Sequence, residues 1–412
     1  MFGRKTIVKS FVSFCLSITL SQIPLTTADA LDSLESEYQE TIETKFSTLQ
    51  LSQFGYVGNQ RVVIGAFQNQ IAVAQSNTSR VEVFSLSNDQ IVLDTSLELT
   101  EILDTKKGAG IYVLDIEYGI KGKLYVSYLD FFDDPTKCDY VKVIEFAKPT
   151  TPPRLIFQST PCLSMLNFSQ QQGSYTASGR MTLSKSTLYI AGGMVMIDLA
   201  HNIYPDPNIA RLSGSFKKDL ALSNLFGSVA KVDLKTLRVT KVSTGHRNPQ
   251  GLVFDPKKNI LWESEHGPSG GDELNIIKQG ANYGWPYVTL GRPYYESDLL
   301  PENNLFKTRY SSHKGFSPPI YSWVPSIAPS QMVVVPDESS FDRTWGGNLL
   351  LSTLKDSAIH RLVLSDSNHV LYDERIEIGH RIRDLAITKS CLWISTDDGK
   401  IILIRPTKNF NN

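Results

Sequence analysis

The 412-residue chain is long enough for one large domain or two ordinary ones. Its 41 Lys and Arg residues nearly balance its 42 Asp and Glu residues, and the net charge of −1 argues against general binding to nucleic acid or to anionic membranes. The 27 Gly, the 20 Pro and the 10% aromatic content are typical of an all-β protein with many turns.

The first thirty residues have the pattern of a secretory signal peptide. A basic start precedes the mostly apolar residues 11–25, and Ala28-Asp29-Ala30 supplies the small-x-small cleavage pattern. The apolar stretch is short and is interrupted by Ser, Gln and Pro, so it is poorly suited to span a bilayer. An uncleaved anchor is the alternative. We expect cleavage near Ala30 and a periplasmic or secreted protein that makes no stable membrane insertion afterwards.

The expected export bears on the roles of the four cysteines. Cys15 leaves with the signal peptide, whereas Cys138 and Cys162 flank a predicted strand pair, and export permits them to form a disulfide. Cys391 falls in a predicted strand and is expected to be a buried thiol. Neither a CxxC motif nor a His-rich metal-binding spacing occurs.

Residues 31–50 begin the mature chain and are acidic and polar. Their spacing is compatible with one amphipathic helix, so we expect an N-terminal helical arm outside the main body. From residue 51 onward the chain becomes a series of short alternating or β-branched segments bounded by turn residues. The first predicted strands are 61–67, 70–75, 80–86, 90–99, 110–118, 123–129, 141–146 and 154–158.

The predicted strands recur in similar units. GLVFDPKKNILWESEHG from Gly251 resembles DLAITKSCLWISTDDG from Asp384, and two further copies begin at Leu114 and Arg180. Each unit is an apolar strand, a short turn, and a second strand that opens with Leu and an aromatic residue, at a spacing of roughly 65 to 70 residues. Such repeats predict a six-bladed β-propeller with four-stranded antiparallel blades over residues 51–412. A pair of β-sandwiches is the alternative.

The stretch from Gly245 to Gly291 holds most of the unusual polar chemistry. Residues 251–254 and 260–263 are predicted to pair through the turn at 255–259. The following segment, Glu265-His266-Gly267-Pro268, suits a close approach of bare backbone to a ligand. Residues 201–226 and 292–317 are irregular and are expected to form excursions over the propeller faces.

Four short motifs within this stretch carry a family resemblance. HRNPQGL, WESEHGP, GGDELN and ANYGWP, in this order, resemble the soluble sugar dehydrogenases that depend on pyrroloquinoline quinone (PQQ), the glucose/sorbosone and aldose sugar dehydrogenase family. The resemblance implies an oxidoreductase that passes hydride from C1 of a sugar to PQQ, with Ca²⁺ as a second cofactor. It also implies a small-molecule sugar or alcohol as the substrate and an electron acceptor that the sequence does not identify.

Cationic residues are expected to meet at one mouth of the propeller. Arg247 follows a turn, Lys355 follows a predicted strand, and Arg381 and Arg383 alternate on an extended segment and so share one face. Solvated surface charge is the alternative for each residue alone. In the resembling family such cations bind the carboxylates and quinone oxygens of PQQ. The positions that match a cofactor-binding role are Arg247, Asn248, Gln250, Lys355, Arg381, Arg383 and Trp323.

The resemblance assigns two further groups of residues. Gly267 and Pro268 match the positions whose carbonyl oxygens hold Ca²⁺ beside the cofactor. His266, Asp272 and Glu273 match residues that line the site, although Asp272 also fits a structural turn. Trp323 resembles the aromatic wall of the site and fits the core equally well. Thr289 and Gly291 fall where some relatives hold another calcium through the main chain.

One position departs from the family pattern. The relatives carry a general-base His four residues before the Arg of a His-x-Gly-Gly-Arg-Leu sequence, and Thr176 stands at that position here. Threonine cannot accept a proton near neutral pH, and the loss of a general base typically costs about 100-fold to 10,000-fold in rate. Two hypotheses stay open: a dehydrogenase with an altered base, for which His201 is one candidate, or a propeller that binds PQQ or sugar without turnover.

Overall fold

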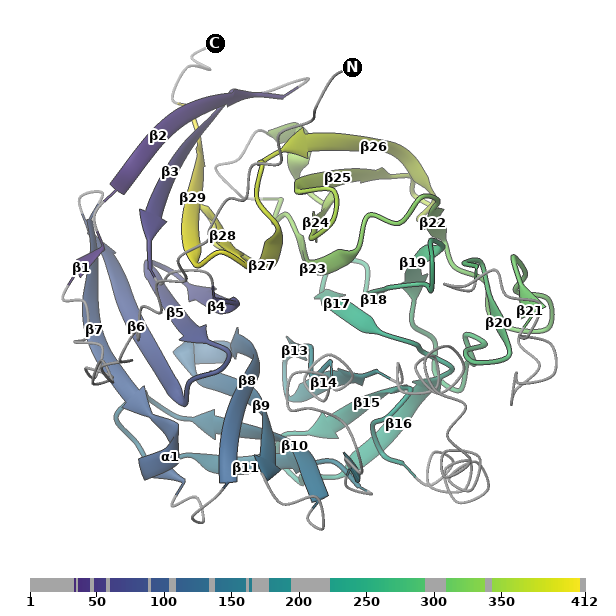
Figure 1. The fold of residues 1–412 in the computed structure, drawn as a ribbon, viewed down its shortest axis with the longest axis horizontal. Helices are drawn as coiled ribbons and strands as arrows, with labels where there is room; N and C mark the ends of the chain where they lie inside the picture. The colour runs from purple at the N-terminus through teal and green to yellow at the C-terminus, as the bar shows by residue number, and fades with distance from the viewer. Residues whose placement is uncertain are drawn as a thin grey trace, which may run out of the picture. The chain divides into compact units, whose positions relative to one another are not determined.

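Short antiparallel strands make up nearly all the regular structure in the computed structural model of the protein. The structure describes residues 33–34, 36–44, 48–56, 60–87, 90–103, 109–132, 138–160, 163–164, 178–193, 223–292, 309–337 and 343–407. These residues belong to a unit that spans residues 32–412, and their sheets form the six-bladed β-propeller that the repeats predict (Figure 1).

The first three blades follow one another along the chain. Blade 1 consists of β4 (Val62–Phe67), β5 (Gln70–Gln75), β6 (Arg80–Ser87) and β7 (Gln90–Glu98), with β1 (Ser33–Leu34) at its outer edge. Blade 2 consists of β8 (Ala109–Tyr118), β9 (Leu124–Phe132), β10 (Cys138–Phe146) and β11 (Arg154–Gln158), and β12 (Leu163–Ser164) also pairs with β10. Blade 3 consists of β13 (Met181–Ser184), β14 (Thr187–Gly192), β15 (Ser228–Asp233) and β16 (Val239–Thr244).

The last three blades complete the ring. Blade 4 consists of β17 (Pro249–Asp255), β18 (Ile260–Glu265), β19 (Asp272–Ile276) and β22 (Tyr321–Trp323). Blade 5 consists of β23 (Pro329–Val334), β24 (Leu349–Thr353), β25 (Ala358–Leu364) and β26 (Val370–Glu377). Blade 6 consists of β27 (Ile382–Ile387), β28 (Leu392–Thr396), β29 (Lys400–Pro406), β3 (Thr48–Gly55) and β2 (Ser36–Glu43). The minor elements are α1 (Leu99–Ile102), η1 (Ile120–Gly122), η2 (Arg343–Trp345) and the parallel pair β20 (Val288–Thr289) and β21 (Arg309–Tyr310).

The first strand of each blade is its innermost strand. Figure 1 shows β4, β8, β13, β17, β23 and β27 closest to the centre, and each of them contacts the next around the ring. The hydrophobic core lies between adjacent blades because each sheet buries both faces. Trp262 of blade 4, for example, packs in one cluster with Leu351 and Leu362 of blade 5. The strands are therefore rich in Val, Ile and Leu on both faces.

The described residues of the 31–50 segment do not form the predicted helical arm. Within the described part of this segment, residues 36–43 form β2, which pairs with β3, and β3 pairs with β29 near the C-terminus of the chain. Leu49 and Leu51 of β3 are buried in the blade 6 core, whereas β2 is mostly exposed. The polar residues of β2 are compatible with either structure, and the free edge of β3 selects the strand because it supplies backbone hydrogen-bond partners.

The other local predictions have mixed outcomes. The eight predicted strands between residues 61 and 158 are confirmed, as is the hairpin of β17 and β18. Cys391 is buried and free, as expected, although it lies one residue before β28. Residues 1–30, the Cys162 side chain, the Cys138 side chain and most of both excursions lie outside what the structure describes. None of the described helices is long and apolar enough to cross a membrane.

Candidate functional site

The loops that carry the sequence motifs lie at one end of the propeller. Because the strands of a blade are antiparallel, the start of its innermost strand lies at the same end as the link between its second and third strands. Arg247 precedes β17, Arg381 precedes β27, residues 266–271 join β18 to β19, and Lys355 lies between β24 and β25. The fold thus gathers cations from blades 4, 5 and 6 at one end.

Asp272 holds two of these loops together. Its side chain is fully buried, and Oδ1 accepts a hydrogen bond from the Gly267 N–H at 3.1 Å. Oδ2 accepts from the Ser326 hydroxyl at 2.7 Å, the Ile327 N–H at 2.9 Å and the Ala328 N–H at 2.8 Å. Both oxygens are therefore committed to backbone and loop contacts, and Asp272 fixes the loop without facing a ligand.

The loop that Asp272 fixes is built for glycine. A Cβ on Gly267 would lie 2.2 Å from the Gly270 carbonyl oxygen and 2.4 Å from that of Gly271, so no side chain fits there. In the described part of the chain, no donor reaches the carbonyl oxygens of Gly267 and Pro268. Hard cations such as Ca²⁺ prefer oxygen ligands of this kind. These two carbonyl groups therefore fit the metal role that the resemblance assigns them.

Arg247 is held at the base of the same loop. The N–H groups of Arg247 and Asn248 both donate to Oε2 of Glu265, and Nη1 of Arg247 donates to the His266 carbonyl oxygen at 2.9 Å. The Arg247 guanidinium also lies 5.5 Å from the centre of the Trp285 ring, within the range of a cation–π contact. Glu265 thus orients the Arg-Asn pair, a role that the EHGP motif did not reveal.

A chain of side-chain hydrogen bonds links Gln250 to His266. Nε2 of Gln250 donates to Oδ1 of Asn248 at 3.0 Å, and Nδ2 of Asn248 lies 3.4 Å from Nδ1 of His266. Nε2 of His266 lies 2.6 Å from the Pro329 carbonyl oxygen and must donate to it, so Nδ1 is the acceptor of the neutral ring. Burial, reinforced by the cations Arg247 and Arg383, lowers the pKa of His266 and keeps the ring neutral.

Asp397 gathers the cations of blade 6. Nε and Nη2 of Arg383 donate to its two oxygens at 2.8 and 3.0 Å, and Nε of Arg381 donates at 3.2 Å. Burial alone would raise the pKa of Asp397, but Arg383 and the neighbouring arginines lower it. Nη1 of Arg381 reaches the carbonyl oxygen of Leu354, which directly precedes Lys355. Lys355 itself is exposed and forms no side-chain ion pair within the described residues.

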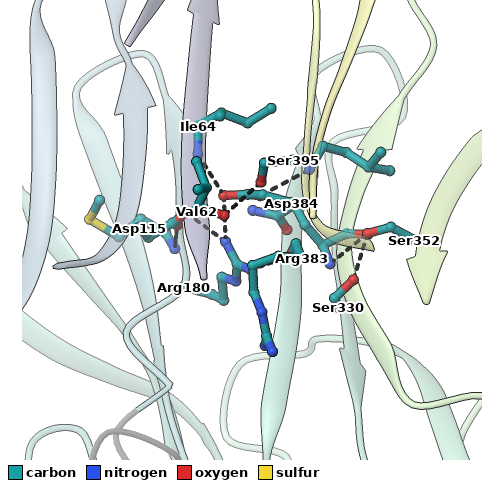
Figure 2. Close-up of polar contacts among 12 residues, drawn as sticks. Val62, Ile64, Asp115, Arg180, Ser330, Ser352, Arg383, Asp384 and Ser395 are labelled. Carbon is teal, nitrogen blue, oxygen red and sulfur yellow. Dashed lines mark hydrogen bonds and ion pairs between the residues drawn. The ribbon is translucent and has the colours of Figure 1, made fainter. Parts of the chain in front are cut away.

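A buried ion-pair network joins innermost strands next to these cations. Figure 2 shows Arg180 between Asp115 of β8 and Asp384 of β27. Nη1 of Arg180 lies 2.8 Å from Asp115 and 3.1 Å from Asp384, and Nη2 donates to the Arg383 carbonyl oxygen at 2.9 Å. Burial raises the pKa of Asp115 to about 7 although Arg180 opposes the shift. Three blades are thus joined through the guanidinium of Arg180, the Arg of the motif that includes Thr176, and the motifs did not indicate either of its carboxylate partners.

A small cavity opens beside the site loops. It surrounds about 240 Å³ of empty space that is partly open to solvent. Four predicted residues line it: Arg247, His266, Gly267 and Glu273. Thr289 also contributes, together with residues to which the motifs assigned no individual site role: Gly245, Glu265, Tyr283, Trp285, Val288 and His313. Nε2 of His313 lies 2.7 Å from Oε1 of Glu273, and this pair closes one side of the cavity.

Behind this cavity lies a buried group of carboxylates. Nδ2 of Asn275 lies 3.0 Å from Glu263 and 3.4 Å from both Glu265 and Glu273. The nearest ligand atoms of His246, Glu263 and Glu265 lie within 4.8 Å of one another. Burial is the main cause that raises the pKa of Glu263 and of Glu273. Burial thus favours the protonated forms of Glu263 and Glu273, while Asn275 and backbone N–H groups satisfy most of the carboxylate oxygens.

Some predicted residues do not join the site. The indole N–H of Trp323 donates to Asp373 at 3.0 Å, and the side chain is 6% exposed within the core between blades 4 and 5. These contacts support the core alternative for Trp323, and its wall role stays a prediction. Thr176 lies outside the described residues. Lys355, Arg381 and Arg383 lie at the same end but do not line the described cavity.

Residues 227–405 match the family model described as glucose/sorbosone dehydrogenase. This match confirms the resemblance to the glucose/sorbosone dehydrogenase family. The aldose sugar dehydrogenase YliI of Escherichia coli is 29% identical over 305 residues, which cover 71% of this chain and 76% of YliI. Quinoprotein glucose dehydrogenase B of Acinetobacter calcoaceticus is 28% identical over 228 residues, which cover 44% of this chain and 46% of that protein.

Two further similarities extend this result. An uncharacterized protein of Synechocystis sp. is 36% identical over 144 residues, and the chain covers about a third of its length, 32%. The crystal structure of the soluble aldose sugar dehydrogenase of Escherichia coli in the apo-form has a TM-score of 0.62 at 22% identity and covers 87% of this chain and 99% of its own. At this identity the structural similarity establishes a shared propeller fold and no more.

Proposed function

We propose that this protein is an exported quinoprotein oxidoreductase that uses PQQ and Ca²⁺ to oxidise C1 of an aldose or a related alcohol. The observation that carries this proposal is the family match over residues 227–405, which contain Arg247, Lys355, Arg381 and Arg383 at one end of the propeller. The names of two relatives, an aldose sugar dehydrogenase and a quinoprotein glucose dehydrogenase, agree with it. The electron acceptor is a separate partner that the fold does not identify.

The residues present fit the cofactors. Lys355 is exposed and Arg381 retains N–H groups beyond those that contact Asp397, so both can bind carboxylates of PQQ. Arg383 and Arg247 supply positive charge beside them, while the carbonyl oxygens of Gly267 and Pro268 suit Ca²⁺. When bound, PQQ supplies the hydride acceptor. The chain contributes the binding, the neutralisation of charge and, through Asp272, the fixed shape of the metal loop.

The proposed reaction also needs a general base that takes the proton from the sugar hydroxyl. Thr176 stands where relatives have a His, and three histidines in or beside the motif stretch already have side-chain partners. His266 uses both ring nitrogens, His313 pairs with Glu273, and the fully buried His246 contacts Ser243 and Glu265. These commitments favour slow turnover, and they give weight to the second candidate function, a propeller that binds PQQ or sugar without oxidising it.

The proposed location follows from the first thirty residues. Their basic start, their short apolar stretch and the Ala28-Asp29-Ala30 site motivate export to the periplasm or beyond. Edman sequencing or intact-mass analysis of the protein from a culture tests this directly. A mature N-terminus near Leu31 is the expected result, and a cell-associated protein that retains residue 1 contradicts export.

Reconstitution tests the function. The purified protein is mixed with Ca²⁺ and PQQ, binding is followed by tryptophan fluorescence, and reduction of an artificial dye is measured with a panel of aldoses. Binding with slow, sugar-dependent dye reduction is expected. Thr176→His is expected to raise the rate by about 100-fold or more if the remaining geometry is that of the relatives. The absence of PQQ binding sinks the first candidate function and the PQQ-binding form of the second, whereas binding without dye reduction until Thr176→His is introduced favours the second.

A further inference from the structure

Arg61 occupies the same kind of position as the predicted site cations, yet no motif includes it. It directly precedes β4, the innermost strand of blade 1. Arg180 precedes β13 and Arg381 precedes β27 in the same way, and Arg247 lies two residues before β17. Because these strands are the first strands of their blades, their starts lie at one end of the propeller. Arg61 therefore adds a cation from blade 1 to that end.

The surroundings of Arg61 are those of the cationic group. Its Cζ lies 5.7 Å from the centre of the Tyr112 ring, which covers one face of the guanidinium. Burial and the neighbouring guanidiniums of Arg383 and Arg180 lower the pKa of Arg61 to about 10, although Asp397 is also near. Arg61 is thus still charged at neutral pH, and it lies within electrostatic reach of the residues that the proposed function uses.

Arg61 differs from Arg180 and Arg383 because its guanidinium has no hydrogen-bond acceptor among the described residues. Arg180 is paired with two buried carboxylates, and both oxygens of Asp397 are used by Arg383. Nε of Arg61 is buried without a hydrogen-bond partner, and its guanidinium forms no hydrogen bond or ion pair in the described part of the chain. The adjacent Ser76, whose N–H donates to the Arg61 carbonyl oxygen, also has a buried hydroxyl group without a partner.

The position of the Arg61 guanidinium lowers the stability of the folded protein, and a bound anion would offset this effect. A partly buried cation beside like charges is destabilising, and Asp397 offsets the charge of Arg61 only from a distance because its oxygens are bound by Arg383 and Arg381. The Tyr112 ring compensates one face of the guanidinium, but it cannot accept the N–H groups that lie in the plane of the guanidinium. A planar carboxylate matches that edge, because two of its oxygens accept parallel hydrogen bonds from one arginine. The protein itself provides no such group for Arg61 among the residues that the structure describes.

We propose that Arg61 is a further binding residue of this site and takes a carboxylate of a bound ligand. The assignment deepens the proposed function, and it rests on that function only for the identity of the ligand. Two sources supply the same chemistry: a carboxylate of PQQ, or the acid group of an acidic sugar such as a uronate. Arg61 would act by binding and would not take part in proton transfer.

The experiment compares four forms of the full-length protein. Arg61→Gln removes the charge, Arg61→Lys keeps the charge without the planar fork, and Arg154→Gln is the matched control. Arg154 is exposed on the outer strand β11 and pairs with Glu145 at 3.3 Å, so its loss changes net charge equally and far from the innermost strands. Because Arg61 has no carboxylate partner among the described residues, Arg61→Gln is expected to fold, which its circular dichroism spectrum checks.

Citrate serves as the first probe because it tests carboxylate binding without PQQ. Thermal unfolding is followed in rising citrate against NaCl of equal ionic strength, which corrects for screening. Citrate is expected to stabilise the wild-type protein and Arg154→Gln. The apparent affinity of Arg61→Gln for citrate should be about 10-fold to 100-fold lower, and that of Arg61→Lys should be intermediate. An equal gain for Arg61→Gln overturns the proposal, as does no gain in the wild-type protein.

Two further arms identify the source of the carboxylate. Weaker PQQ binding by Arg61→Gln in fluorescence titration assigns the carboxylate to the cofactor. Unchanged PQQ binding with a selective loss of glucuronate over glucose as ligand or substrate assigns it to an acidic sugar. A wild-type protein that binds citrate through Arg61 but ignores PQQ refutes the proposed function and leaves the Arg61 assignment standing. PQQ and glucuronate binding that are both unaffected in Arg61→Gln overturn the assignment alone.

Discussion

The carboxylate of Asp397 binds the guanidinium of Arg383 through two hydrogen bonds, Nε to Oδ1 at 2.8 Å and Nη2 to Oδ2 at 3.0 Å. Arg381 shares this carboxylate, and Arg61 lies within its field. Asp397→Asn is expected to lower the free energy of unfolding by about 1–3 kcal/mol, because hydrogen bonds to a charged group are lost and the cations repel one another. Urea denaturation measures the change.

Asp366→Asn is the control for Asp397→Asn, because Asp366 is exposed on the turn between β25 and β26. It is expected to leave the urea midpoint unchanged. Sulfate should recover part of the stability lost in Asp397→Asn, since an added anion can neutralise the exposed edge of the cation group. Equal midpoints for Asp397→Asn and the wild-type protein contradict a counter-ion role for Asp397.

The network in Figure 2 predicts a large effect at Arg180. Arg180→Ala leaves Asp115 and Asp384 buried without their shared cation, and the expected loss is about 3–5 kcal/mol of unfolding free energy. Arg154→Ala is the comparison at an exposed ion pair and should cost less than about 1 kcal/mol. Chemical denaturation of both variants tests the contrast, and equal losses would show that burial does not govern these pairs.

Gly267→Ala is expected to disrupt the proposed metal loop. The added Cβ would lie 2.2 Å from a backbone oxygen that cannot move without breaking the loop held by Asp272. Calcium affinity, measured by titration calorimetry, should fall by about 10-fold or more. Gly280→Ala is the control for general backbone strain, since Gly280 has a positive φ but an added Cβ there would meet no atom within 4 Å. A retained affinity in Gly267→Ala argues against these carbonyl groups as ligands.

The pair of His313 and Glu273 predicts a pH dependence of stability. Burial lowers the pKa of His313, but the hydrogen bond to Glu273 and the nearby Glu265 outweigh it, and the pKa is raised. The contribution of protonated His313 to the free energy of unfolding is therefore complete below the ordinary pKa of 6.5. It is lost as the pH rises through the higher pKa of His313 in the folded state. The melting temperature should fall over this window, and His313→Gln should flatten the fall. His369→Gln, at an exposed turn, should not.

The sequence predicts those features of the fold that short segments decide. The hairpin of residues 251–254 and 260–263 is marked by apolar runs and by the turn residues between them, and both signals are local. Residues 36–43 show the limit, because their polar pattern does not distinguish a helix from an edge strand. Their structure depends on β3, whose other partner, β29, lies at the opposite end of the chain.

The candidate site shows the same division. Arg247, His266, Gly267 and Glu273 lie in one continuous stretch, and their motifs find them. Asp115 and Asp397 are not predicted as site residues because their own sequence segments do not indicate which arginine each will pair with. Asp115 reaches Arg180 only after blades 2 and 3 are placed side by side. The sequence leaves two roles open for Trp323 for a related reason, since its indole N–H donates to Asp373 of the next blade.

The last blade joins strands from both ends of the chain, since β3 pairs with β29 along the register from Gly55 with Lys400 to Leu49 with Pro406. The ribosome must therefore complete synthesis of β29 before it can pair with β3. Until then, one edge of β3 has no strand partner in the nascent chain. Truncation before Lys400, which removes β29, should consequently give insoluble protein. A circular permutant that keeps both strands and has its new termini in a surface turn should be tolerated.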